Sequence, residues 1–352
     1  MVDTVQQLAA FLRTLQTAAW VALDTEADSL HAYPEKLCLI QISTAAGDDL
    51  IDPLARIDIG AMFDALASHE IVMHGADYDL RLLNRHHQFT PRAIFDTMLA
   101  ARLAGARQFG YSHLVEHHLG VPLEKGAQKA NWALRPLAPR LEQYARNDTR
   151  YLKPLADRLA AELEAKGRLA WHQEACARLI HDSTHALPPD ADAVWRIRGS
   201  QVLGPPTLAI LRELWRWREA EAIAANRPPF FIMSHEVLVA IAAAAAAGRP
   251  IEPVLPTHVP DRWRASLTKA VAAGLALPRE QHPSVLKRVV DRLTGAEQKR
   301  VLELQTRRDA RAAALGIDPT LVANRATLVD LARNWDAHAG ALMAWQRELM
   351  QP

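Results

Sequence analysis

The sequence predicts an α+β (α/β) fold in which a first domain with a mixed sheet is followed by all-helical domains. Up to about residue 165, short apolar runs alternate with segments of helical periodicity, which is typical of a sheet covered by helices. Beyond that residue the strand patterns disappear, and alanine, leucine and arginine dominate. An internal repeat in this helical part is the third observation. The 352 residues also exceed the roughly 100–200 of one domain.

Four short strands are expected in the first domain, residues 1–165. Residues 20–23 form an apolar run that ends at Asp24, and residues 37–42 form a second run. Residues 49–52 follow a turn-like Ala-Ala-Gly, which indicates a hairpin, and residues 71–74 give the fourth strand. Helices are predicted at 79–84, 97–103 and 141–159, and Asp96 is expected to cap the helix that begins at Thr97.

The helical part is predicted to hold a linker, residues 166–203, and two domains, residues 204–285 and 286–352. Breakers at Leu187-Pro188-Pro189 and Gly204-Pro205-Pro206 mark the connector. Residues 214–242 align with residues 304–332 at an offset of 90, with nine of 29 positions identical. Each copy is interpreted as a helix, a proline-containing turn and a second helix.

The composition excludes several classes of protein. With 49% apolar and 23% charged residues the chain is not disordered, and its net charge of +1 is close to neutral. The longest apolar run, residues 237–247, is well short of the roughly 20 residues that span a bilayer. Cys38 and Cys176 are the only cysteines, which argues against a disulfide framework or a cysteine-bound metal. We therefore expect a cytoplasmic protein with no membrane segment.

Two groups of acidic residues follow predicted strands. Asp24 and Glu26 are two apart, so within an extended strand both carboxylates point to one face. Asp79 lies just beyond the fourth strand, at the start of a helix. The alternatives are a turn after the first strand and a helix cap at Asp79.

Tyr144 and Asp148 are four apart in a helical pattern, which places phenol and carboxylate on one helix face. A single Tyr-x-x-x-Asp is a weak signal by itself. Together, however, four carboxylates on strand ends and a helix are the ligands that two divalent cations about 4 Å apart require, and Mg²⁺ prefers oxygen ligands.

These residues resemble the ribonuclease D family, in the tyrosine-containing subtype of the DEDD 3′→5′ exonuclease superfamily. Asp24-Thr25-Glu26, continuing through Tyr33-Pro34 to Leu39-Ile40-Gln41-Ile42, is similar to the first motif. His74 with Asp79 is similar to the second, and Tyr144, Asp148 and Tyr151-Leu152 to the third. Ala130 and Thr149 depart from the usual serine and valine. The helical domains resemble HRDC domains, the second a degenerate copy, so the resemblance implies a ribonuclease H-like exonuclease domain followed by two HRDC-like domains.

The resemblance also implies the chemistry. Two divalent cations, Mg²⁺ or Mn²⁺, would be held by Asp24, Glu26, Asp79 and Asp148, with Asp24 bridging them. Tyr144 would orient the attacking water, because a phenol with a pKa near 10 is a poor base. RNA would lose nucleoside 5′-monophosphates one at a time from its 3′ end.

The expected substrate is RNA with a single-stranded 3′ end, such as a tRNA precursor, and the expected state is a monomer. Candidate substrate contacts are Leu30, His74, Lys129, Trp132, Arg135, Arg212 and Arg216. The alternatives are a core residue at Leu30, a histidine packed against the sheet at His74, a solvated face at Lys129 and Arg135, and an ordinary amphipathic helix at Arg212 and Arg216. A DNA 3′→5′ exonuclease or a non-catalytic nucleic-acid-binding module are the alternative functions, since the sequence does not show whether the 2′-hydroxyl is recognised.

Overall fold

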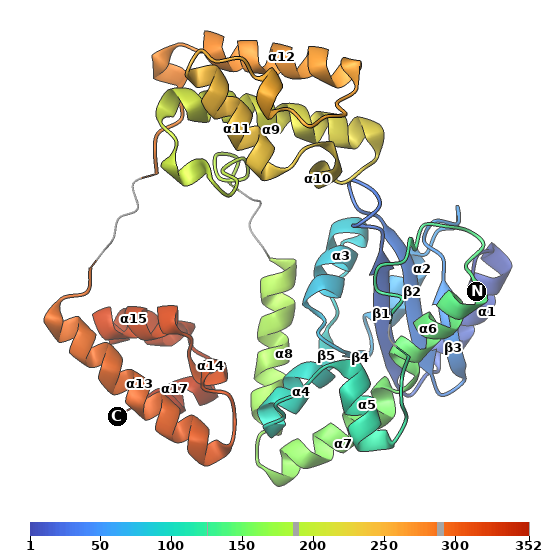
Figure 1. Ribbon diagram of the computed structural model, residues 1–352. Helices are drawn as coiled ribbons and strands as arrows, with labels where there is room; N and C mark the ends of the chain where they lie inside the picture. The colour runs from blue at the N-terminus through green and yellow to red at the C-terminus, as the bar shows by residue number, and fades with distance from the viewer. Residues whose placement is uncertain (125, 186–189, 287–291, 352) are drawn as a thin grey trace. The chain divides into compact units, whose positions relative to one another are not determined.

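The computed structural model describes residues 1–124, 126–185, 190–286 and 292–351 (Figure 1). The chain divides into two compact units. Unit 1 comprises Met1–Ala27, Leu37–Ala186 and Asp291–Pro352, and unit 2 comprises Asp28–Lys36 and Leu187–Val290. The predicted breaker at Leu187-Pro188-Pro189 lies outside the described residues, as do residues 287–291 beside the predicted 285/286 boundary.

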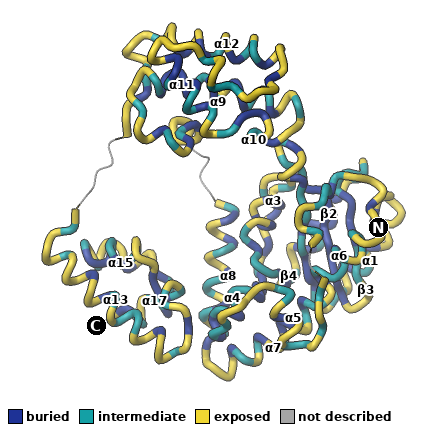
Figure 2. Tube along the Cα trace, viewed as in Figure 1, coloured by how far each residue is buried: buried dark blue, intermediate teal, exposed yellow. Residues whose placement is uncertain are grey.

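A five-stranded mixed sheet in the order β3-β2-β1-β4-β5 forms the centre of unit 1. Its strands are β1 (Val21–Ala27), β2 (Leu37–Thr44), β3 (Gly47–Ile51), β4 (Glu70–Met73) and β5 (Ala93–Asp96). The first three strands pair antiparallel, whereas β4 runs parallel to β1 and β5. Strand β2 is buried along its whole length (Figure 2). The mixed sheet expected from the sequence is therefore confirmed.

Alternating side chains of β1 and β4 enter two different cores. Val21, Leu23 and Ile71 pack with α1 (Val5–Gln16), α2 (Gly60–Leu66), α3 (Asp77–His87) and α8 (Leu169–Thr184). Ala22 and Val72 pack with α4 (Thr97–Ala104), α5 (Tyr111–Leu119) and α7 (Leu152–Ala165). On the α7 side of the sheet, α6 (Pro139–Arg150) packs on β2 and β3. Residues two apart along β1 thus share a face, as the strand period requires.

The helix predicted over 141–159 is two helices, α6 and α7, that meet at Tyr151. Pro154 explains the break, because it has no N–H for the carbonyl of Arg150, and its ring would clash with that carbonyl in a continuous helix. The cap predicted at Asp96 is confirmed, since its side chain accepts hydrogen bonds from the N–H groups of Met98 and Leu99. Strand β5 was not predicted, because Ile94-Phe95 is too short an apolar run to be distinctive.

Unit 2 consists of helices α9 (Pro205–Ala225), α10 (Pro229–Ile232), α11 (His235–Ala246) and α12 (Asp261–Ala276). The first three recur 90 residues later as α13 (Gly295–Leu315), α14 (Pro319–Val322) and α15 (Arg325–Arg333) in unit 1. Both copies have the predicted helix, proline turn and second helix, and the bounds of the first helix and the turn coincide at that offset. The repeat is therefore structural and not a coincidence of alanine content.

The second copy packs on the first domain within unit 1, together with α16 (Trp335–His338) and α17 (Ala344–Met350). Trp345 stacks on Trp171 of α8, with ring centroids 4.9 Å apart. Arg168, at the start of α8, donates a hydrogen bond of 2.6 Å to the carbonyl of Leu315. Helix α8 lies within the segment predicted as a linker, and it is part of unit 1. No helix among the described residues has the length and apolarity needed to cross a membrane.

Candidate active site

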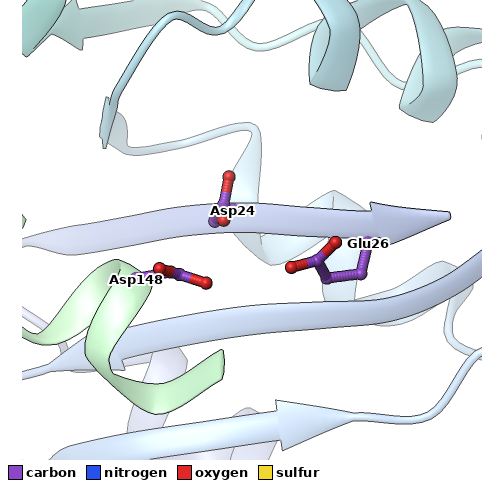
Figure 3. Close-up of side chains that lie close together, drawn as sticks. All are labelled: Asp24, Glu26 and Asp148. Carbon is purple, nitrogen blue, oxygen red and sulfur yellow. The ribbon is translucent and has the colours of Figure 1, made fainter. Parts of the chain in front are cut away.

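Three carboxylates meet on the face of the sheet under α6. Asp24 and Glu26 lie within β1 and not beyond its end, because β1 continues to Ala27 by pairing with β2. Asp148 reaches them from the last turn of α6. One ligand oxygen from each of these side chains lies within 4.8 Å of the others (Figure 3). We call Asp24, Glu26 and Asp148 the acidic cluster.

Asp79 approaches from the first turn of α3 and is buried. The hydroxyl of Thr25, between the two acidic residues of β1, donates a hydrogen bond to its carboxylate. The charge of Asp79 raises the pKa of Asp24, so the two groups interact electrostatically. Asp79 is not the N-cap residue of α3, which is Ala76; it lies in the first turn, where a carboxylate also complements the helix dipole.

A cavity of about 950 Å³ opens over these groups. It is lined from β1, α3, α5 and α6 and from the segment before α6. The predicted site residues among its lining are Asp24, Glu26, His74, Asp79, Tyr144 and Asp148. Four predicted carboxylates from three distant parts of the chain therefore face one cavity.

The carboxylates are strongly perturbed. Burial, with added repulsion from Asp148 and Asp79, raises the pKa of Glu26 to about 9. Burial raises the pKa of Asp148 to about 8 and that of Asp79 to about 6. The pKa of Asp24 is also raised, by burial first and then by the charges of Asp79, Asp148 and Glu26. Within the described parts of the chain, none of the ion pairs joins a lysine or arginine to any of the four. Such a donor set fits a divalent cation, which would supply the missing positive charge.

Tyr144 lies one turn before Asp148 on α6. Burial and the charges of Asp148, Glu26 and Asp24 raise the pKa of its phenol, so the hydroxyl stays protonated near neutral pH. Its ring contacts that of Trp132, which is buried, with centroids 6.2 Å apart. The phenol is thus placed to donate a hydrogen bond beside the acidic cluster.

His74 and Tyr111 also line the cavity, with ring centroids 5.4 Å apart. The Thr97 hydroxyl donates to the carbonyl of Met73 at 3.1 Å and lies 2.9 Å from Nδ1 of His74. Nδ1 is therefore the donor to Thr97, which leaves Nε2 as an acceptor. Burial lowers the pKa of His74, so the ring is neutral at pH 7.

Tyr111 was not predicted as a site residue. Its hydroxyl donates a hydrogen bond of 2.9 Å to the carbonyl of Asn147, next to Asp148. That carbonyl lies in the last turn of α6, where helix carbonyls lack an intrahelical partner. Tyr78, His113, Arg140 and Gln143 also line the cavity without having been predicted. Their only sequence signal was proximity to the motifs, because their positions on α3, α5 and α6 follow no distinctive spacing.

Arg135 is fully engaged in the fold. Its guanidinium donates two hydrogen bonds to Asp52, at 2.6 and 2.7 Å, and others to the carbonyls of Trp132, Leu134 and Cys38. These contacts favour the structural alternative for Arg135, and we do not carry it forward as a phosphate contact. Trp132 is 1% exposed and likewise packs in the core.

The remaining predicted contacts do not line the cavity. Lys129 is exposed in the segment before α6. Leu30, Arg212 and Arg216 belong to unit 2, whereas every cavity residue belongs to unit 1. Arg212 and Arg216 both form ion pairs with Glu213. Thr149, which departs from the usual valine, places its hydroxyl 2.7 Å from that of Ser43 and so ties α6 to β2.

Comparisons with known proteins agree with this geometry. A family model for 3′-5′ exonucleases matches residues 1–164, and a model for the HRDC domain matches residues 207–247. Ribonuclease D of Xanthomonas oryzae pv. oryzae is 33% identical over 345 residues, covering 95% of this chain and 91% of that protein. Ribonuclease D of Zymomonas mobilis subsp. mobilis is 32% identical over 343 residues, covering 95% and 82%.

A solved structure extends the similarity to the fold. The crystal structure of Escherichia coli RNase D, described as an exoribonuclease involved in structured RNA processing, has a TM-score of 0.78 and 25% sequence identity. The match covers 99% of this chain and 96% of that one. Exonucleases of this fold depend on divalent metal ions, and the acidic cluster offers oxygen ligands for them. The resemblance seen in the motifs is therefore confirmed, and the chain belongs to the ribonuclease D family of 3′-5′ exoribonucleases.

Proposed function

We propose that this exoribonuclease holds two divalent cations, Mg²⁺ or Mn²⁺, on Asp24, Glu26, Asp79 and Asp148, and removes nucleotides from single-stranded RNA 3′ ends. The observation that carries the proposal is the acidic cluster, with oxygens within 4.8 Å of one another and no lysine or arginine paired to it among the described residues. Bound divalent cations lower the pKa of water and offset charge on the leaving oxygen.

In this proposal the protein's own side chains bind the cations and orient the attacking water and the terminal nucleotide. Asp24, whose pKa is raised by burial and by the charges of Asp79, Asp148 and Glu26, would be shared by the two cations. Tyr144 donates its hydroxyl proton in a hydrogen bond to the attacking water and thereby holds it in line with the terminal phosphodiester; the raised pKa excludes it as a base. His74 offers Nε2 as an acceptor to the terminal nucleotide. Leu30 and Lys129 remain predicted substrate contacts.

The cavity supports a single-stranded substrate. Tyr78, Tyr111 and His113 supply rings on which bases can stack, and Arg140 supplies a cation for the backbone. A single-stranded RNA can place its 3′ end in such a cavity more readily than a continuous duplex can. We propose precursors of structured RNAs such as tRNA as substrates, a monomer as the active form, and the cytoplasm as the compartment, in keeping with a sequence that has only two cysteines.

The experiment is digestion of a 5′-labelled single-stranded RNA with a free 3′ end, with Mg²⁺ or Mn²⁺ and then with EDTA. The proposal expects a ladder that shortens by one nucleotide at a time, with nucleoside 5′-monophosphates as products, and no cleavage after chelation. A 3′-phosphorylated or duplex end is expected to resist. Internal cuts, or an undiminished rate in EDTA, would refute the proposal. The matching DNA strand measures the preference for RNA.

A further inference from the structure

Gln41 is a fully buried amide whose side chain has no hydrogen-bond partner. It lies in the middle of β2 with 0% of its surface exposed. Neither Oε1 nor Nε2 has a partner among the described residues. A buried amide without partners costs free energy, so native proteins keep few of them, and each requires a physical explanation.

The sheet register places Gln41 directly beside the acidic cluster. Gln41 pairs with Asp24 across the antiparallel β1–β2 ladder. Residues directly opposite in such a ladder point to the same face, with Cβ atoms about 4.5–5.5 Å apart. Glu26 is opposite Leu39 on the same face. The amide of Gln41 therefore adjoins the central carboxylate of the site.

The other neighbours of Gln41 within the sheet offer no hydrogen bond that competes. On the far side it pairs with Leu50 of β3, which is apolar and buried. Ser43, the next residue on this face, is already engaged with Thr149 and Asp48. The adjacent Ile40 and Ile42 point to the opposite core. Within the sheet, Asp24 is thus the neighbour whose carboxylate can use an amide donor.

We infer that Gln41 is a positioning residue that donates a hydrogen bond from Nε2 to the Asp24 carboxylate when that carboxylate binds a divalent cation. The inference rests on the proposed function. Hydrogen bonds from outer groups orient metal-binding carboxylates, and losing one such bond commonly weakens metal affinity or activity by about 10–100-fold. The unpartnered amide of Gln41 is then a donor that lies beside a carboxylate proposed to bind metal.

The test compares two methionine substitutions in β2 of the full chain. Gln41→Met keeps the length of the side chain but removes the amide, and Ile42→Met introduces the same residue on the opposite face. Calorimetric titration with Mn²⁺ is expected to give a dissociation constant about tenfold higher for Gln41→Met and unchanged for Ile42→Met. The Tm in EDTA is expected to be equal to or above that of the wild type for Gln41→Met, because an unpaired amide is removed, and lower for Ile42→Met.

The outcomes separate this inference from the proposed function. Wild-type binding of Mn²⁺ by Gln41→Met would overturn the role of Gln41 while leaving the proposed function intact. Absence of Mn²⁺ binding by the wild type would overturn the proposed function itself. If Gln41→Met does not fold, Gln41→Leu provides the same comparison. A purely structural role predicts the opposite pattern, a lower Tm with unchanged Mn²⁺ affinity.

Discussion

Asp52 is a buried carboxylate of unit 1 and the acidic cluster is half-buried, yet among the described residues only Asp52 forms an ion pair with a cation of the chain. Burial by itself would raise the pKa of Asp52, but the hydrogen bonds and charge of Arg135 lower it below its usual value. At Glu26 no lysine or arginine of the described residues forms an ion pair, and burial with two neighbouring carboxylates raises its pKa to about 9. The same domain therefore neutralises one buried carboxylate internally and leaves the other group dependent on a cation from solution.

The largest expected effect is on turnover when the central carboxylate is lost. Asp24→Asn removes the proposed metal ligand whose charge interacts with all three other carboxylates, so we expect kcat to fall by about 10³-fold or more. The metal-free variant should nevertheless unfold at a higher temperature than the wild type, because mutual repulsion is relieved. RNA digestion and thermal unfolding in EDTA measure the two effects. A less stable Asp24→Asn protein would contradict the idea that the cluster is uncompensated.

Asp52→Asn is the matched substitution at the carboxylate that Arg135 neutralises. It is expected to lower stability, whereas Asp24→Asn is expected to raise it. It leaves a three-quarters buried guanidinium without its counter-charge, since the Arg135 side chain is 26% exposed. We expect the free energy of unfolding to fall by about 2–3 kcal/mol. Denaturant titration tests this, and Mn²⁺ affinity serves as the control that should not change. Equal losses of stability at Asp24 and Asp52 would remove the distinction between the two sites.

Much of the fold and of the acidic cluster could be predicted from the sequence. The two-residue spacing of Asp24 and Glu26 and the four-residue spacing of Tyr144 and Asp148 fix which side chains share a face in any strand or helix. The distances between these groups depend on pairing between distant segments, which local patterns do not encode. The role of Arg135 was missed for that reason: its partner Asp52 is 83 residues away. The break at Tyr151 could have been predicted from Pro154.

Tyr144→Phe separates positioning from metal binding. Because the phenol is not a predicted metal ligand, its loss should lower kcat by about 10²-fold while the Mn²⁺ dissociation constant changes by less than about twofold. Single-turnover digestion and calorimetry measure the two quantities. Loss of Mn²⁺ binding in this variant would instead mean that Tyr144 holds the cluster together.

The two carboxylate sites should also respond oppositely to pH. Glu26 and Asp148 have pKa values raised to about 9 and about 8. In the folded protein without metal they therefore stay protonated to a higher pH than in the unfolded chain. Their contribution to stability is present at low pH and is lost as the pH rises from about 4 to about 9. Asp52, whose pKa is lowered, contributes above about pH 4, and that contribution is lost as the pH falls.

Unfolding of the wild type in EDTA between pH 5 and 9 is the measurement. We expect stability to decline with rising pH, and the decline to be shallower in Asp24→Asn. A curve that is flat or rises across this range would show that the acidic cluster is compensated by groups of the chain itself.

The smallest expected effect concerns the wall of the cavity. Arg140 lines it with a largely exposed side chain, 3.8 Å from Glu124. Arg140→Ala should raise KM severalfold, leave kcat nearly unchanged and reduce the salt dependence of RNA binding by about one charge. Arg216→Ala, at an exposed arginine already paired with Glu213, is the control. A larger effect of Arg216→Ala than of Arg140→Ala would indicate that RNA binds mainly to unit 2 and not at the cavity.

Diffraction from crystals of the protein grown with Mn²⁺, recorded for the anomalous signal of manganese, tests the central claim most directly. The account predicts anomalous density between Asp24, Glu26 and Asp148, at about 2.0–2.3 Å from their oxygens, with a second ion bridged by Asp24 toward Asp79. Crystals that contain Mn²⁺ at saturating concentration yet show no density at the acidic cluster would contradict it.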